Sequence, residues 1–207
     1  MLELLEKLKD GILDILFPKF CVGCGREGIY ICKDCEIFFG ELPPSPDVMS
    51  VWEYEGLMEK LIYKIKFDGC YHIVDELVDK VMAKIELNLP ADTYITYMPM
   101  HKKKEKQRGF NQAELIAKKV GQATGRPITK LLKKIKDNRS QVGLGPKERE
   151  ENVKDIFEYC SQDSRIANVL LVDDVYTTGA TMRECIKVLR KNGIKNIWGF
   201  TLSRKMS

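Results

Sequence analysis

The sequence predicts an α/β protein: an open, mostly parallel sheet with flanking helices, preceded by a small cysteine-rich module. Segments of strand composition alternate with segments of helical periodicity, which is typical of parallel sheets with helical crossovers. One strand, Val169–Val172, is apolar throughout, as expected when both faces of a strand are buried. Two C-x2-C motifs near the N-terminus predict the module. The 207 residues, 44% of them hydrophobic, can form one sizeable core and such an appendage.

The first segment, Met1–Pro18, has apolar residues at helical spacing and is predicted to form an amphipathic helix that packs on the protein's own body. Acidic residues interrupt its apolar positions, so it does not resemble a signal peptide. No later segment has the run of apolar residues that a transmembrane helix needs. The expected location is therefore the cytoplasm.

Four cysteines then follow in a pattern that is typical of a metal site: Cys21, Cys24, Cys32 and Cys35. Two residues between the cysteines of each pair let both thiolates reach one tetrahedral ion, and Gly23 and Gly25 suit the tight turn. We expect a structural Zn2+, because four protein ligands leave no coordination position open. Disulfides, a redox C-x2-C motif and an iron–sulfur cluster are the alternatives, and the lack of an export signal counts against disulfides.

A proline-rich stretch, "GELPPSPDV", follows the cysteine cluster. Its three prolines exclude a helix or a central strand, so it is predicted to be a linker. We therefore expect two units: an N-terminal helix and zinc module with its linker, residues 1–45, and a main domain, residues 46–207.

The main domain is predicted to alternate strands and helices. The expected strands are Val51–Tyr54, Tyr94–Pro99, Val169–Val172 and Ile197–Leu202. The expected helices, each soon followed by a glycine or a proline, are Leu57–Phe67, Ile73–Leu87, Asn111–Ala123 and Thr181–Lys191. Open α/β sheets bind ligands at the C-terminal ends of their strands, which is where Asp173 and Asp174 fall.

Two acids and a turn of small residues end the apolar strand, in the stretch "VLLVDDVYTTGAT". Small residues let backbone N–H groups approach an anion, and the N-terminus of the following helix favours a phosphate. The hydroxyls of Thr177, Thr178 and Thr181 add donors. The carboxylates of Asp173 and Asp174 suit a vicinal diol or a hydrated cation, so the combination predicts a bound ribose 5-phosphate. A Rossmann-like turn with unrelated acids and a response-regulator acidic pair are the alternatives.

The same stretch closely resembles the phosphoribosyl pyrophosphate (PRPP) motif of type I phosphoribosyltransferases. The resemblance implies that Asp173 and Asp174 contact the ribose hydroxyls. It also implies that the 5-phosphate lies in the turn formed by Thr177, Thr178, Gly179, Ala180 and Thr181.

More of the chain resembles one branch, the ComF family of competence proteins. The matching features are the cysteine pairs, the string R-G-F-N-Q at Arg108–Gln112 and the later segment "SQVGLGPKEREENVKDIFE". The resemblance covers nearly the whole chain. It implies a phosphoribosyltransferase fold with a small hood, here Val51–Tyr71, and a role in DNA uptake during natural transformation. DNA-uptake proteins and single-stranded DNA are the partners that follow from it.

A basic segment precedes this motif. Pro99–Glu150 holds 15 Lys/Arg against 5 Asp/Glu, whereas the whole chain has a net charge of only +4. The excess predicts an anionic ligand, either phosphate or nucleic acid, with a solvated helix face as the alternative. In the wider phosphoribosyltransferase family, the loop after the strand that matches Tyr94–Pro99 holds the pyrophosphate of PRPP. The matching residues here are Met100, His101, Lys102 and Lys103, with Lys104, Lys106 and Arg108 within reach.

Pyrophosphate gains charge as its bond to the ribose breaks, so these cations and Mg2+ would stabilise the transition state. The alternative is a solvated basic loop that binds anions without chemistry. Asn138–Asn152 is expected to form a mobile loop that closes over PRPP, or else a plain surface loop. Lys64 and Lys66 are candidate anion contacts in the hood, but a solvated helix face is the expectation for both.

Three functions fit these features. The first is an enzyme that transfers phosphoribosyl from PRPP to a nitrogen acceptor and releases pyrophosphate. The second is a regulator that binds PRPP or a nucleotide without turnover. The third is an accessory protein of DNA uptake that contacts DNA or a partner protein. The hood contains no residue that identifies a catalytic base, so no catalytic residue is assigned.

Overall fold

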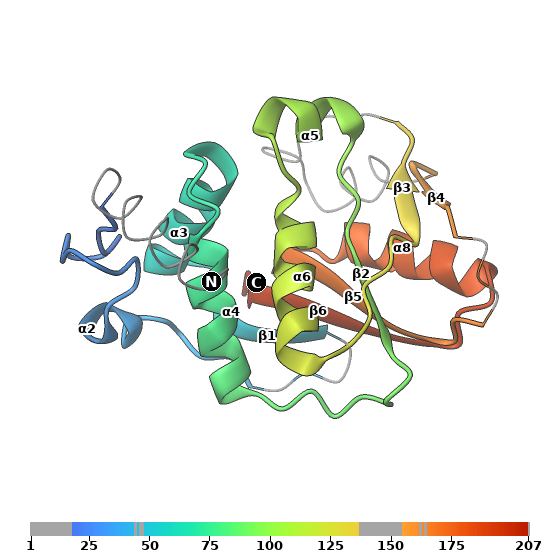
Figure 1. Cartoon of the computed structure of the whole chain (residues 1–207), viewed down its shortest axis with the longest axis horizontal. Coiled ribbons are helices and arrows are strands. Elements are labelled where there is room, and N and C mark those ends of the chain that lie inside the picture. The colour runs from blue at the N-terminus through green and yellow to red at the C-terminus, as the bar shows by residue number, and fades with distance from the viewer. Residues whose placement is uncertain are drawn as a thin grey trace, which may run out of the picture.

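The centre of the molecule is a four-stranded sheet in the order β1-β6-β5-β2 (Figure 1). The structure is a computed structural model that describes residues 18–43, 45, 48–136, 155–161, 163 and 165–206. The strands of the sheet are β1 (Val48–Glu53), β2 (Tyr94–Tyr97), β5 (Asn168–Tyr176) and β6 (Asn196–Arg204). Every neighbouring pair runs parallel. The predicted fold class, α/β with a mostly parallel sheet, is confirmed.

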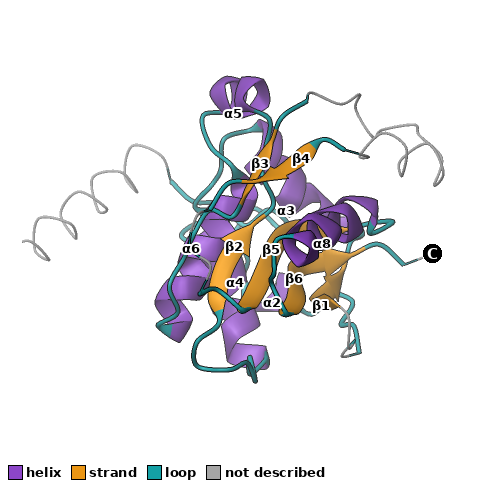
Figure 2. Cartoon of the chain, turned by 90° about the vertical axis from the view of Figure 1, so that its right-hand side faces the viewer, coloured by secondary structure: helices purple, strands orange, loops and turns teal. Residues whose placement is uncertain are grey.

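Helices cover both faces of this sheet. They are α3 (Gly56–Phe67), α4 (Ile73–Lys84), α6 (Gln112–Thr124) and α8 (Ala180–Lys191). The helices α4 and α6 pack against each other, and α6 lies on β5 and β2. The helix α8 lies on the opposite face (Figure 2). The four expected helices are therefore present, although α4 ends three residues early because the backbone becomes extended at Ile85.

The core forms where the apolar pattern of the sequence predicted it. All four side chains of Val169–Val172 are fully buried, as expected for a strand covered on both faces. From α4, Leu77 is also fully buried, and Leu189 is its counterpart on α8. This core fixes the C-terminal ends of β2 and β5 beside each other.

The strand β5 is longer than predicted and ends at Tyr176, so Asp173 and Asp174 lie within it rather than after it. The cause is the neighbouring strand: β6 pairs with β5 along its whole length, including Asp173 with Thr201. Ladder pairing with β6 thus keeps two charged residues in a strand that local composition alone would end.

A helix that was not predicted follows β2. The helix α5 (Lys102–Arg108) replaces the basic loop that the sequence suggested after β2. His101 caps its first turn, because its Nδ1 atom accepts from the backbone N–H of Lys103 at 3.4 Å. Gly109 ends it in the left-handed conformation with φ of 86°. The residues between them are mostly lysine, glutamine and glutamate, which favour helix once both ends are capped.

A short antiparallel hairpin was also missed. It is formed by β3 (Leu132–Lys134) and β4 (Phe157–Tyr159), and it stands above the sheet next to α8. Strands of three residues carry too little alternation to be recognised, and two of the three residues of β3 are lysines.

The cysteine-rich segment packs on the body of the molecule. Its helix α2 (Lys33–Glu36) follows an antiparallel bridge between Phe20 and Glu27. The backbone N–H groups of Tyr30 and Ile31 donate to the carboxylate of Glu76 on α4 at 3.1 Å. The described part of the proline-rich stretch also contacts the sheet. The backbone N–H of Leu42 donates to the carbonyl of Val51 on β1, and the N–H of Glu53 donates to the carbonyl of Gly40. The boundary at residue 45 stays a prediction.

Two expected segments lie outside the described residues: most of the amphipathic helix Met1–Pro18 and the loop Asn138–Asn152. Among the described helices, none has the length and apolar character that a membrane crossing requires.

Candidate functional site

Two adjoining cavities lie at the C-terminal end of β5. The first measures about 310 Å3 and is lined by the cationic side chains of Lys66, Lys104, Arg108 and Lys134. The second measures about 140 Å3 and lies against the turn between β5 and α8, with Thr177, Gly179 and Ala180 in its wall. Lys66, Asp173 and Thr181 line both cavities. Among the described residues that line them, Asp173 is the only acid.

The turn between β5 and α8 requires a glycine at its last position. Gly179 has φ of 73°, in the left-handed region. A Cβ atom there would lie 2.2 Å from the hydroxyl of Tyr176. Arg183 on α8 stabilises the turn, because its guanidinium donates to the carbonyl of Thr178 at 2.8 Å. The turn thus has a fixed shape, with the N-terminal end of α8 facing the smaller cavity.

Asp173 lies between the two cavities. Its Oδ1 atom accepts from the backbone N–H of Asp174 at 2.9 Å. Burial, together with the negative charge of Asp174, raises the pKa of Asp173 to about 7, although the N–H bond and the positive charges of Lys66 and Lys134 oppose the rise. The carboxyl therefore changes its protonation state near neutral pH.

Asp174 points to the other face of the strand, because successive side chains in a strand alternate. It is only 5% exposed, and its Oδ2 atom lies 2.8 Å from Nζ of Lys66. Burial alone would lower the pKa of Lys66, but the charge of Asp174 outweighs it and the pKa rises. The expectation of a solvated helix face is therefore wrong for Lys66. It holds for Lys64, which is half-exposed and faces Asp68 at 3.3 Å.

The R-G-F-N-Q string forms the joint between α5 and α6. Asn111 caps α6 by accepting from Ala113 N–H at 3.0 Å, and its Nδ2 donates to the carbonyl of Met98 at 3.0 Å. Arg108 donates to Oε1 of Gln112 at 2.6 Å. Partial burial lowers the pKa of Arg108, opposed by the charge of Asp174. The joint thus holds the Arg108 side chain in the wall of the larger cavity.

The predicted ligand-binding residues divide into two groups. Those that line a cavity are Met100, Arg108, Asp173, Thr177, Gly179, Ala180 and Thr181. Those that do not are His101, Lys102, Lys103, Asp174 and Thr178. The division within the basic segment follows from α5: in a helix, residues four apart share a face, so Lys104 and Arg108 line the cavity while Lys102 and Lys103 are exposed.

Sequence reasoning gave no leading part to Lys66, Lys104 or Lys134. The spacing of Lys104 and Arg108 would have pointed to one face, had α5 been recognised as a helix. Lys66 was named as a candidate anion contact, but no local signal could have placed it or Lys134 at this cavity, because each reaches the cavity from an element distant in the chain, α3 and β3.

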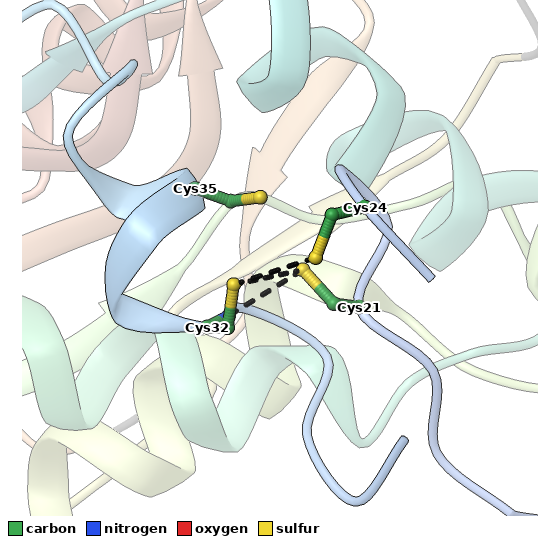
Figure 3. Close-up of side chains that lie close together, drawn as sticks. All are labelled: Cys21, Cys24, Cys32 and Cys35. Atoms are coloured by element: carbon green, nitrogen blue, oxygen red, sulfur yellow. Dashed lines mark hydrogen bonds between the residues drawn. The ribbon is translucent and has the colours of Figure 1, made fainter. Parts of the chain in front are cut away.

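The four cysteines of the N-terminal segment form a second site (Figure 3). Their sulfur atoms all lie within 4.8 Å of one another, and the Cys21–Cys32 and Cys24–Cys32 sulfur pairs are 3.6 Å apart. A tetrahedral ion with Zn–S bonds of about 2.3 Å requires sulfurs about 3.8 Å apart. The cluster could therefore hold a metal ion such as zinc.

The backbone around the cluster suits thiolate ligands. Burial would raise the pKa of Cys21, but N–H groups, first that of Cys32, lower it to about 6. Burial and the neighbouring sulfurs raise the pKa of Cys35 to about 12. Gly23 is needed here, because a Cβ atom on it would lie 2.6 Å from the sulfur of Cys35. The other three cysteines, Cys70, Cys160 and Cys185, lie outside the cluster.

Comparison with curated proteins finds relatives that are named competence proteins. The chain is 29% identical over 200 residues to competence protein F of Haemophilus influenzae, covering 88% of this chain and 84% of that protein. It is 28% identical over 193 residues to competence protein ComFC of Bacillus subtilis, covering 89% and 77%. No family model matches the chain.

Over most of its length the chain is therefore similar to curated competence proteins named F and ComFC. These relatives confirm the resemblance to competence proteins that was predicted from the cysteine pairs, the R-G-F-N-Q string and the PRPP-like motif. A further relative is the DNA utilization protein YhgH of Escherichia coli K12, 24% identical over 196 residues, covering 90% of this chain and 84% of that one. Among solved structures, TT1426 from Thermus thermophilus matches with a TM-score of 0.34 and 13% identity, over 66% of this chain and 85% of that one, which is too weak to support a conclusion.

Proposed function

We propose that this chain binds PRPP across the two adjoining cavities and transfers its phosphoribosyl group to a nitrogen acceptor, with release of pyrophosphate. The observation that carries the proposal is the pairing of the cavities. One ends at a turn of small residues at a helix N-terminus, and the other is lined by four cations. Asp173, Lys66 and Thr181 belong to both, as a single ligand with two anionic ends would require.

In this proposal the 5-phosphate of PRPP lies in the smaller cavity. Backbone N–H groups at the start of α8 and the hydroxyls of Thr177 and Thr181 would donate to it. The ribose hydroxyls would face Asp173, which lines both cavities. Asp174 would act on the ligand through Lys66, which it holds at 2.8 Å.

The pyrophosphate would lie in the larger cavity, among Lys66, Lys104, Arg108 and Lys134. As the bond between the ribose C1 atom and the pyrophosphate oxygen breaks, negative charge collects on the leaving oxygen. Cations fixed in a partly enclosed site stabilise that charge more than they stabilise intact PRPP, so they lower the barrier. The electron pair leaves with the pyrophosphate, the acceptor nitrogen forms the new bond to C1, and the proton released from that nitrogen passes to solvent or to the departing pyrophosphate.

Mg2+ fits this donor set as a companion of PRPP. It is usually bound through one or two carboxylates together with substrate phosphates, and Asp173 is a carboxylate in the wall of both cavities. When bound, Mg2+ would neutralise part of the pyrophosphate charge. The four cysteines would hold a Zn2+ that stabilises the N-terminal segment and takes no part in the transfer.

The names of the relatives support a role connected with DNA uptake. They are competence proteins and DNA utilization proteins. A second candidate function, a PRPP-binding accessory protein without turnover, is favoured by one observation. Asp173 is the only acid among the described residues that line the two cavities, and its assignment to the ribose hydroxyls leaves no other carboxylate there to act as a general base for the acceptor.

Calorimetric titration with PRPP and Mg2+ tests the proposal, with the neighbouring variants Lys104→Ala and Lys103→Ala as a matched pair. Lys104 lines the larger cavity and Lys103 is exposed on the same helix. We expect Lys104→Ala to weaken PRPP binding roughly tenfold, as the loss of one charge-assisted hydrogen bond does, and Lys103→Ala to leave it unchanged. Ribose 5-phosphate, which lacks the pyrophosphate, should not distinguish the two variants.

Release of pyrophosphate with an amine or nucleobase acceptor separates the two functions. Release supports the transferase, and tight PRPP binding without release from any acceptor supports the accessory protein. Wild-type protein that does not bind PRPP at all would contradict both.

A further inference from the structure

A second basic surface lies on the outer side of α8. A groove of about 780 Å3 runs between α8 and the strands β6 and β1, and we call it the α8 groove. Its rim carries Arg183, Lys187, Arg190 and Lys191. Its floor includes the apolar side chains of Ile186, Ile197 and Trp198. None of the described residues of the basic stretch Pro99–Glu150 lines this groove.

The charge of the groove is of one sign. All four rim cations are exposed, and none of the described residues that line the groove is acidic. The nearest acid on the helix, Glu184, lies 3.4 Å from Lys187 and is only 13% exposed. Within the described part of the chain, Arg190 and Lys191 form no ion pair. The rim thus presents a net positive charge to solvent, which attracts a polyanion.

The spacing of the cations suits a linear ligand. Arg183, Lys187 and Lys191 follow one another at intervals of four residues, which places them along one side of α8 about 6 Å apart. A chain of regularly spaced phosphates can meet such a row in sequence, whereas a single phosphate would use only one or two of its members.

The floor adds an aromatic ring. Trp198 is half-exposed on β6, while the other tryptophan, Trp52, is fully buried. Proteins bind single-stranded nucleic acid by combining a positively charged groove with aromatic side chains on which unpaired bases stack. A duplex keeps its bases stacked on one another, and an acidic peptide carries no base, so neither would use this ring.

We propose that the α8 groove binds single-stranded nucleic acid, with phosphates along Lys187, Arg190 and Lys191 and a base on Trp198. The inference rests on the DNA-related part of the proposed function and names the surface that serves it. It does not require PRPP. The groove does adjoin the smaller cavity, because Tyr176 and Met182 line both.

Fluorescence anisotropy with a labelled oligo(dT) tests the cations. The triple variant is Lys187→Ala/Arg190→Ala/Lys191→Ala. Arg183 is left in place, because it donates a hydrogen bond to the carbonyl of Thr178 in the turn between β5 and α8. We expect the triple variant to bind at least tenfold more weakly at low salt. The slope of log affinity against log salt should fall by about 2, since each lost phosphate contact removes about 0.7 for single strands.

The matched control removes three exposed lysines from α5 instead: Lys102→Ala/Lys103→Ala/Lys106→Ala. It changes the net charge equally and should keep most of the affinity. If the α5 variant loses binding and the α8 variant retains it, the groove is not the site. Calorimetry with PRPP on the α8 variant separates the two proposals, because loss of oligo(dT) binding with PRPP binding intact concerns the groove alone.

Tryptophan fluorescence tests the ring directly, because Trp52 is buried and Trp198 is the accessible tryptophan. Oligo(dT) should quench the wild-type emission, and Trp198→Ala should abolish the quenching and weaken binding roughly tenfold. Unchanged affinity in Trp198→Ala, together with displacement of the oligonucleotide by poly-glutamate at equal charge, would overturn the proposal in favour of an acidic protein partner. Equal affinity for duplex and single strand would overturn it as well.

Discussion

Asp173 and Asp174 are adjacent in the chain but meet different surroundings. Asp173 faces the two cavities and α8, whereas Asp174 faces Lys66 from α3. The alternation of side chains along β5 is the cause. Lys66 compensates the buried charge of Asp174, while Asp173 has no cation that offsets its burial fully, so its pKa is raised to about 7. One acid of the pair is thus structural, and the other is available to a ligand.

The raised pKa of Asp173 gives a pH-dependent prediction. Between its ordinary pKa of 3.8 and about 7, the folded state holds a proton that the unfolded state has released, so stability falls as pH rises through this range. Asp173→Asn cannot ionise and should avoid this loss. We expect it to raise the free energy of unfolding at pH 8 by about 1–2 kcal/mol, less than the whole shift implies because the carboxyl lines open cavities.

Urea denaturation at pH 8 and at pH 4 measures this effect. At pH 4 wild-type Asp173 is protonated in the folded state and about 40% protonated in the unfolded state, so the gain should be much smaller than at pH 8. A gain of the same size at both pH values would mean that the amide stabilises the strand for a reason other than charge.

At the scale of elements, the joint between α5 and α6 decides which cations reach the cavity. Gly109 ends α5 and Asn111 starts α6 within three residues, so the direction of α5 is tied to β2 through the bond from Asn111 to the carbonyl of Met98. The guanidinium carbon of Arg108 lies over the ring of Phe67 on α3, 5.5 Å from the ring centroid. The main role of the R-G-F-N-Q string is therefore to set the backbone path between α5 and α6. Its arginine, Arg108, is the residue of the string whose charge faces the cavity.

We expect Asn111→Ala to lower the free energy of unfolding by about 2–3 kcal/mol. The change removes a helix cap, worth about 1 kcal/mol, and leaves the buried carbonyl of Met98 without its donor, which costs another 1–2 kcal/mol. Asn192→Ala is the control, because Asn192 also donates to a carbonyl, that of Val188, but at the exposed end of α8. Its cost should be below about 0.5 kcal/mol. Equal losses in urea titrations of the two variants would show that the joint is not a special constraint.

At the scale of the whole molecule, residues that flank the cysteine cluster belong to the core of the sheet, while the buried cysteines form a small cluster of their own. Ile31 and Phe39, which flank the second cysteine pair, are buried, and Phe39 meets the ring of Trp52 at 5.2 Å. The carboxylate of Glu76 on α4 caps the N–H groups that lead into Cys32. Loss of the metal should therefore loosen the N-terminal segment and weaken its contact with α4, while the sheet keeps the larger part of the core.

Metal content of Cys24→Ser and Cys160→Ser tests this arrangement. Both cysteines are exposed, but only Cys24 belongs to the cluster. We expect one zinc ion per chain in wild type and in Cys160→Ser. Cys24→Ser should lose the metal, become sensitive to proteolysis near residues 18–43 and keep its helical circular dichroism. Metal-free wild type, or stoichiometric zinc in Cys24→Ser, would contradict the assignment.

The sequence by itself determined what depends on neighbours along the chain. The four-cysteine pattern, the alternation of strands and helices, and the acid–turn motif after Val172 each span a short stretch, so spacing and periodicity suffice to predict them. Only the tertiary structure decided which side chains meet. Lys66 and Lys134 reach Asp173 from distant elements, α5 is a helix because both its ends are capped, and the α8 groove combines α8 with β6 and β1. Such meetings depend on the order of strands in the sheet, which places the first strand beside the last, and no local pattern encodes that order.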